Sequence, residues 1–374
     1  MAPRTIARRA LLLGLSGVLP ATNILRAQSG KGTNLSLKPL HFLDPATEFD
    51  LYRLTDPAKT SVLPAPNLHC ISRRGRFLVH GSDHSGATQA WRLDWHTGEA
   101  RQLTAAVQLD ASTIAMTNDD HTLFFFDGPS LRRMTMPGLR EREAAHVDAG
   151  WQRAPGFSVA LDGSAAAWVE KRENQSRLRV LRSANGAAET LVEAGGILSD
   201  PQLRPGHTQI SYRAGNEVRL ADLNSPGSHA IQLAPDASVG QVLWSPAGQT
   251  LLYLSTPADP KQLTALREYS PDDATDKLVA KTSQFASFGI NADASVFVGA
   301  SRSLASPYVL LLLRVARREL TLCEHRSSNP VSVAPVFSPD SQNIFFTSDR
   351  NGKPALYRLH VEKFVEETDD EQPG

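Results

Sequence analysis

The chain of 374 residues contains few cysteines, no excess of charge and no long apolar run. Its two cysteines, Cys70 and Cys323, are too few for a disulfide framework or, by themselves, a zinc site. Lys and Arg together number 39, as do Asp and Glu, so the formal net charge is zero. This balance argues against broad binding to nucleic acid or to an anionic membrane. The longest internal candidate for a membrane span, Tyr308 to Val315, contains Arg314 and is far shorter than the roughly 18 apolar residues needed.

The first 28 residues have the pattern of an export signal. Arg8 and Arg9 precede the apolar run Ala10 to Leu19, and a small residue, Ala27, marks the expected cleavage site. The paired arginines are typical of a twin-arginine signal, so we expect a periplasmic or secreted mature chain without a membrane span. The alternative is a short N-terminal membrane anchor. At the other end, residues 365–374 are acidic and are expected to form a disordered tail.

Export would place both cysteines in a compartment that permits a disulfide. Cys70 and Cys323 nevertheless lie in apolar, strand-like runs, where buried free cysteine is common. We therefore expect them to be unpaired.

A turn of the Ser-Pro-Asp-Gly kind recurs seven times between short apolar runs. The fourth residues of these turns lie 42 to 47 residues apart, and they are Gly75, Asp120, Gly163, Gly206, Gly248, Ala294 and Ser341. The runs that follow are four to six residues long and rich in β-branched and aromatic residues, as in strands. No segment shows a sustained helical period with caps. Two stacked β-sandwiches would not explain the constant interval.

Four short antiparallel strands in each unit of this length are typical of a β-propeller blade. The sequence therefore predicts an all-β, seven-bladed β-propeller of four-stranded antiparallel blades over residues 40–364. Because a ring must close, residues 49–55 are expected to supply the outer strand of the last blade. The other strands of that blade are expected within residues 334–364.

Candidate functional residues lie just before each turn, because the first strand of a blade lines the central channel. Of the eleven histidines, only His69 stands clearly on the approach to an inner strand. Arg153 is a candidate partner for a carboxylate ligand, and Trp151 a candidate sugar platform. The His-x-His, His-Glu-x-x-His and Gly-x-Ser-x-Gly motifs are absent, so the usual zinc and serine-hydrolase signals are missing.

The last repeat resembles a blade of the TolB-type and oligogalacturonate-lyase propellers, which are related to WD40-like repeats. The residues that carry this resemblance are Phe337-Ser338-Pro339-Asp340, Ile344 to Pro354 and Leu356-Tyr357-Arg358. The segments 51–56, 97–104 and 201–205 are more similar to the oligogalacturonate-lyase family. That resemblance implies a seven-bladed lyase that cleaves pectin-derived uronate oligomers by β-elimination. In this family a manganese ion, held by three histidines and a glutamine, binds the uronate carboxylate, and a histidine removes the neighbouring proton.

The sequence departs from this family pattern at nearly every functional position. Two metal-binding histidines of the last blade are replaced by Ser332 and Ala334, and the glutamine position falls near Asn329. The third histidine position falls on Gln241, and the general-base histidine falls near Asp200. These side chains are poor ligands for a borderline transition metal, so no bound cofactor is expected, although the family implies manganese.

Two functions remain open at this point. The first is an exported lyase of the oligogalacturonate-lyase family with a degenerate metal site, in which Asp200 and His69 are the candidate catalytic residues. The second is a non-catalytic, TolB-like propeller that holds a sugar, peptide or protein partner in its funnel. The candidate binding residues for an acidic oligosaccharide or protein partner are Arg153, Gln202, Gln241, Trp151, Asn329 and Ser332.

Overall fold

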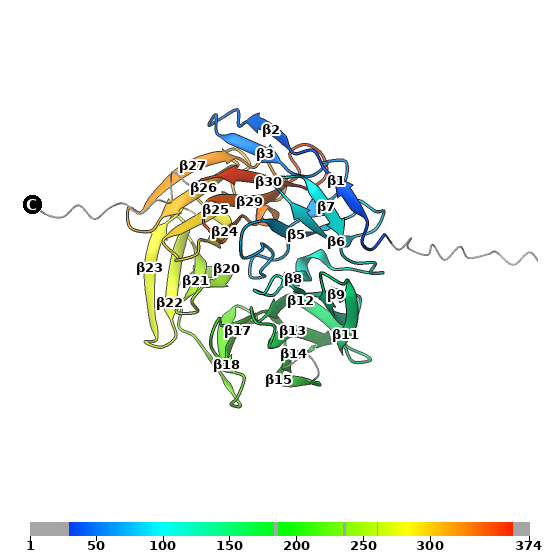
Figure 1. The fold of residues 1–374 in the computed structure, drawn as a ribbon. Coiled ribbons are helices and arrows are strands. Elements are labelled where there is room, and N and C mark those ends of the chain that lie inside the picture. The colour runs from blue at the N-terminus through cyan, green and yellow to red at the C-terminus, as the bar shows by residue number, and fades with distance from the viewer. Residues whose placement is uncertain (1–29, 183–185, 235–236, 260, 362–374) are drawn as a thin grey trace, which may run out of the picture.

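Seven antiparallel sheets are arranged as blades around a central channel (Figure 1). The computed structural model describes residues 30–182, 186–234, 237–259 and 261–361. The described residues contain 30 strands and two short 3₁₀ helices, η1 (Ala111–Thr113) and η2 (Pro330–Val333). The predicted seven-bladed, all-β propeller is confirmed. The expected export signal and acidic tail lie outside the described residues.

The strands of each blade follow one another from the channel outward. Blades one to three comprise β4 (Ser61–Val62), β5 (Phe77–Ser82), β6 (Gln89–Asp94) and β7 (Glu99–Gln102); β8 (Ala115–Met116), β9 (Thr122–Asp127), β10 (Ser130–Thr135) and β11 (Arg140–His146); and β12 (Gln152–Val159), β13 (Ala165–Arg172), β14 (Gln175–Arg182) and β15 (Ala188–Ala194). Blades four to six comprise β16 (Leu198–Leu203), β17 (Gln209–Ala214), β18 (Glu217–Asp222) and β19 (Ser228–Ala230); β20 (Ala237–Trp244), β21 (Leu251–Pro257), β22 (Ala265–Ser270) and β23 (Thr275–Lys281); and β24 (Phe285–Ile290), β25 (Val296–Ser301), β26 (Tyr308–Leu313) and β27 (Arg318–Glu324). Blade seven comprises β28 (Val336–Phe337), β29 (Asn343–Ser348), β30 (Ala355–His360), β3 (Asp50–Arg53) and β2 (Leu40–Leu43).

The chain closes the ring as expected, by adding an N-terminal strand to the last blade. Strand β3 pairs antiparallel with β30, with Tyr52 opposite Arg358. The Leu356 amide donates to the Thr55 hydroxyl at 2.9 Å, which extends the join beyond the strand itself. The structure also adds two strands that were not expected. Strand β2 is a fifth strand of blade seven, and β1 (Asn34–Ser36) pairs with β7 as a fifth strand of blade one.

The recurring turns close the hairpin between the first and second strand of each blade. In six of them the amide of the predicted fourth residue donates to the carbonyl of the first residue, as Gly75 does to Ser72. The turn of blade four lies one residue later than expected, with His207 bonded to Arg204. In the other six turns the fourth residue has a positive φ of 59° to 73°. This left-handed conformation explains why glycine is frequent at that position.

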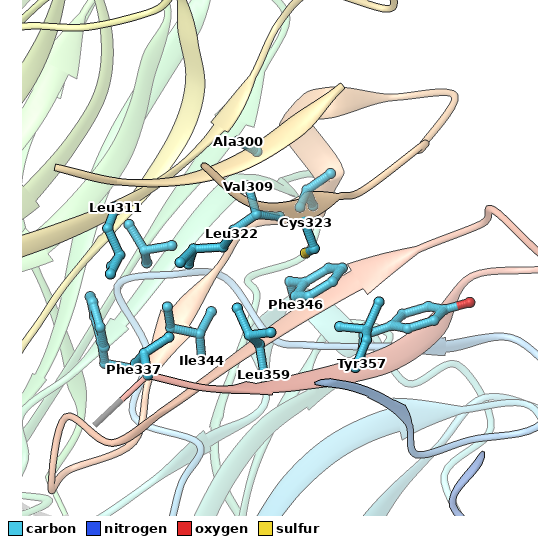
Figure 2. Packing of buried hydrophobic residues seen from close by; sticks show 14 of the residues in the cluster. Ala300, Val309, Leu311, Leu322, Cys323, Phe337, Ile344, Phe346, Tyr357 and Leu359 are labelled. Atoms are coloured by element: carbon cyan, nitrogen blue, oxygen red, sulfur yellow. The ribbon is translucent and has the colours of Figure 1, made fainter. Parts of the chain in front are cut away.

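Neighbouring blades pack against one another through apolar side chains that face the next sheet. Figure 2 shows this between blades six and seven, where Leu311 and Leu322 lie opposite Phe337, Ile344 and Leu359. All of these side chains are buried. The interface illustrates why each strand needs apolar residues on both faces.

Both cysteines are buried and free, as expected. Cys323 lies within the interface of blades six and seven, and Figure 2 shows its sulfur atom there. Burial raises the pKa of the Cys70 thiol to about 12 and raises that of Cys323 as well. Neither thiol is therefore activated. No helix among the described residues has the length and apolar character needed to cross a membrane.

Candidate functional site

The inner strands β4, β8, β12, β16, β20, β24 and β28 line the channel. We call the end where they begin the strand-start end, and the end where they lead into the recurring turns the turn end. The candidate functional residues predicted from the sequence are distributed between these two ends of the channel. Asp200, Gln241, Asn329 and Arg153 lie toward the strand-start end, whereas Gln202 and His69 lie nearer the turns.

Four inner strands are irregular toward the strand-start end. The pairing of β12, β16, β20 and β24 with their neighbours shifts register at 153–157, 199–202, 239–242 and 285–287. Such bulges release backbone groups from the ladder and are frequent beside functional sites. At the bulge of blade five, the carbonyls of Val239 and Gly240 accept from Arg213 of blade four.

Asp200 lies in the bulge of β16, where its φ is +50°. Its carboxylate is 3.2 Å from the Arg213 guanidinium, with the Asp200 side chain 49% exposed and the Arg213 side chain 17% exposed. Arg213 also donates to the carbonyls of Val239 and Gly240 in the bulge of blade five. The guanidinium therefore joins blades four and five, and the charge of Asp200 is compensated.

Arg213 is a functional candidate that the sequence reasoning missed. It follows the predicted strand Gln209 to Tyr212 and so lies after a turn, outside the segments that precede the turns. The available signal was a single arginine at the far end of a second strand. A single arginine in the sequence does not indicate which groups of the neighbouring blade will accept its hydrogen bonds.

Arg153, at the start of β12, forms a second arginine–carboxylate pair. Its guanidinium contacts the Asp110 carboxylate and lies 5.0 Å from the centre of the Phe126 ring. Asp110 also caps η1 by accepting from the Ser112 amide. The pair therefore joins blades two and three, as Arg213 and Asp200 join blades four and five.

Trp151, the proposed sugar platform, is covered by cations. The guanidinium groups of Arg177 and Arg172 lie 4.0 and 4.7 Å from ring centres of its indole. Arg177 is itself held by Glu170, at 2.6 Å, and by Asp148. A sugar would therefore have to compete with guanidinium groups for contact with this ring.

The side chains of Gln202 and Gln241 form hydrogen bonds with the next blade. The Gln202 amide donates to the Val242 carbonyl at 2.7 Å. The Gln241 amide both donates to the Phe288 carbonyl at 2.9 Å and accepts from the Phe288 amide at 2.8 Å. These bonds use the side-chain groups that a ligand would otherwise contact.

Asn329 and Ser332 shape the approach to the last blade. The Asn329 side chain accepts from the Val331 amide at 3.2 Å and so caps η2. The Ser332 hydroxyl donates to the Asn329 carbonyl at 2.7 Å. Among the described residues there is no group of three or more His, Cys, Asp or Glu side chains that could hold a metal ion.

His69 lies apart from Asp200, in the lining of a cavity at the turn end. Its Nε2 atom is buried and has no hydrogen-bond partner among the described residues. Burial lowers the pKa of His69, partly offset by the charge of Asp120. The imidazole is therefore neutral at pH 7.

The strand-start end can bind a carboxylate or orient a sugar. Arg153 and Arg213 are partly exposed and each is paired with an aspartate that is itself partly exposed. A guanidinium has five donors and can contact a second carboxylate without losing the first. Asp200 is the carboxylate of this region with a candidate role as a base.

Comparisons with known proteins agree with the resemblance described above. The chain is 24% identical to an oligogalacturonate lyase of Dickeya dadantii over 381 residues, which cover 88% of this chain and 98% of the relative. It is 23% identical to an oligogalacturonide lyase of Pectobacterium atrosepticum over the same share of both chains. A solved oligogalacturonate lyase in complex with manganese superimposes with a TM-score of 0.84 at 21% identity, covering 89% of this chain and 98% of that one. No model of a protein family matches the chain. The resemblance to oligogalacturonate-lyase propellers is confirmed over nearly the whole length.

Proposed function

From this resemblance, we propose that the protein binds pectin-derived uronate oligomers at the strand-start end of its channel. The observation that carries the proposal is the position of Arg213 between the bulges of blades four and five, where it contacts Asp200 and the Gly240 carbonyl. A uronate carboxylate that enters this region meets a preformed guanidinium. Arg153 supplies a second cation on blades two and three. Two cations suit an oligomer with a carboxylate on each sugar.

The manganese site of the family does not fit the residues of this chain. Both groups of the Gln241 amide bond to Phe288, and the Asn329 oxygen accepts from Val331. Ser332 and Ala334 offer at most a neutral hydroxyl, and none of the four positions holds a carboxylate or an imidazole. We therefore propose binding without the manganese-dependent elimination that the family resemblance implies.

The proposed location is the periplasm or the exterior of the cell, where pectin fragments would be encountered. The support is the arginine-rich, apolar N-terminus with its small residue at position 27.

Titration of residues 28–374 with trigalacturonate in a calorimeter tests the proposal. Binding is expected, and Arg213→Gln is expected to weaken it by at least about tenfold, as for loss of a charge-assisted contact. Arg318→Gln is the matched control, because Arg318 is exposed on the outer strand β27. The melting temperature of each variant separates loss of binding from loss of folding.

The same protein is assayed for the unsaturated product by ultraviolet absorbance, with manganese and then with a chelator. No turnover is expected in either condition. Turnover that requires manganese would show that a metal site is assembled from other residues and would contradict the proposed loss of catalysis. Turnover that survives the chelator but is lost in Asp200→Asn would instead assign Asp200 as a metal-free base. Absence of binding by the folded protein would contradict the proposed function itself.

A further inference from the structure

A cavity of about 990 Å³ occupies the turn end of the channel, away from the arginines discussed above. Its wall is made by the last residues of the inner strands and by the turns that follow them. The apolar part of the wall comprises Ile71, Leu203, Leu243, Trp244, Ile290 and Phe337. A volume of this size and a mainly apolar wall are typical of sites for small organic molecules.

Most polar groups in the wall are already used by the protein. The Gln202 amide donates to Val242, and the Asn67 amide donates to the Phe157 carbonyl at 2.8 Å. The Asn291 oxygen accepts from the Val296 amide, and its nitrogen contacts the Ser295 hydroxyl. A ligand can therefore form few new hydrogen bonds with this wall.

The charges around the cavity disfavour an anion. The Arg204 guanidinium is buried, and both of its terminal nitrogens bond to the Asp272 carboxylate at 2.9 Å. At the rim, hydrogen bonds from Ser164 lower the pKa of Asp162, which keeps this carboxylate charged. Asp120 is close enough to His69 to affect its titration. Arg204, the only Lys or Arg among the described lining residues, is thus already paired, and the charge of Asp162 at the rim disfavours a uronate.

His69 adds no charge to the wall. Its Nε2 atom is buried and has no partner among the described residues, so this atom does not face the cavity. Burial lowers the pKa of His69, which keeps the ring neutral at pH 7. The imidazole therefore contributes to the wall without attracting an anion.

We propose that the turn end of the channel is a second binding site, which takes a neutral, largely apolar small molecule. The site is separate from the uronate site, which lies at the strand-start end. The two ends differ in chemistry, since one presents partly exposed arginines and the other a mainly apolar wall.

Fluorescence titration with N-phenyl-1-naphthylamine, a neutral aromatic probe with one N–H group, tests the proposal. The folded protein, residues 28–374, is expected to give a saturable increase with one site. Ile290→Arg places a cation in the apolar wall and is expected to weaken binding at least tenfold. Ala247→Trp, at an exposed turn position of the rim, fills the opening without disturbing a strand and is expected to do the same.

Ile197→Arg is the control, because Ile197 is 77% exposed and does not line the cavity. It is expected to leave probe binding unchanged. The proposal is overturned if the folded protein shows no saturable binding, or if both Ile290→Arg and Ala247→Trp bind the probe normally. Competition by trigalacturonate would also overturn it, because the cavity would then be the uronate site. Probe binding that is indifferent to trigalacturonate supports two separate sites.

Discussion

At the residue scale, burial lowers the pKa of three histidines, His69, His80 and His325. His80 on β5 is 2% exposed, and its Nδ1 atom bonds to the Gly81 carbonyl at 3.2 Å, while its Nε2 atom has no partner among the described residues. Burial lowers the pKa of His80 to about 4, with the Gly81 hydrogen bond opposing the shift. The folded protein therefore excludes the protonated form of this side chain.

This depressed pKa predicts acid sensitivity. The unfolded chain binds a proton at His80 below its ordinary value of 6.5, whereas the folded chain does so only near pH 4. The free energy of unfolding should therefore fall as the pH drops from 6.5 toward 4, by about 2 kcal/mol at pH 5 from this group. Urea unfolding at pH 7 and pH 5 measures the fall.

The variant His80→Phe cannot take up the proton, so the difference in stability between pH 7 and pH 5 should shrink by about 2 kcal/mol. Comparing the two pH values cancels any change in packing. His229→Phe, at an exposed position of β19, should leave the difference unchanged. An undiminished difference in His80→Phe would contradict the assignment of the acid sensitivity to His80.

At the element scale, the recurring turn is the feature that connects sequence to fold. The constant interval of the turns predicted the number of blades, because each hairpin needs a reversal at the same place. Three of the left-handed fourth positions are occupied by Asp120, Ala294 and Ser341 instead of glycine. An alanine in this conformation is strained, since its Cβ approaches the following carbonyl.

Ala294→Gly should therefore raise the stability by about 1 kcal/mol, because relief of the strain exceeds the extra freedom of the unfolded chain. Ala292→Gly, in the same turn but without a positive φ, should lower it slightly. Thermal unfolding of both variants measures the two effects. Equal effects of the same sign would mean that backbone strain does not decide the preference at position 294.

Pairings between elements were predicted less completely than the elements themselves. The closing role of residues 49–55 followed from the need to complete a ring, and β3 fulfils it. The fifth strands β1 and β2 were missed, because three or four residues beside a proline carry little strand pattern of their own. They form because the exposed edges of β7 and β3 supply backbone partners.

For the candidate site, too, the sequence predicts where residues lie along the chain but not which groups of the next blade they contact. The segments before the turns lie on or at the start of inner strands in blades three to six, on β12, β16, β20 and β24. In blade seven, however, Ser332 lies in η2, and His69 lies outside any strand, although His69 and Gln202 line the cavity. Gln202 and Gln241, which the sequence predicts as ligand contacts, bond to backbone groups of the next blade. Such contacts depend on how two sheets are set against each other, and a linear pattern does not contain that relation. Arg213 was missed for the same reason.

At the scale of the whole molecule, closure of the ring joins residues near opposite ends of the chain. Besides the β3–β30 pairing, the buried Asp44 carboxylate lies 3.5 Å from Arg350 and accepts from the Glu324 amide at 3.2 Å. Thr47 donates to the Leu322 carbonyl at 2.7 Å. The N-terminal segment 40–56 therefore contacts blades six and seven at several points.

Because each blade is covered by its neighbours, loss of the closing strands should affect the whole ring. A protein that begins at residue 57 lacks β1, β2 and β3 and leaves the edge of β30 unpaired. We expect it to unfold at lower urea concentration and over a broader range than a protein that begins at residue 30.

Adding a peptide of residues 30–56 in trans should restore part of the stability, since the strand pairing and the Asp44–Arg350 contact can form again. The same peptide with Asp44→Ala should restore less, because Arg350 would then be buried without its carboxylate. If the shortened protein unfolds as sharply and at the same urea concentration as the longer one, the N-terminal strands do not contribute to the stability of the ring. Contacts between blades would then close the ring alone.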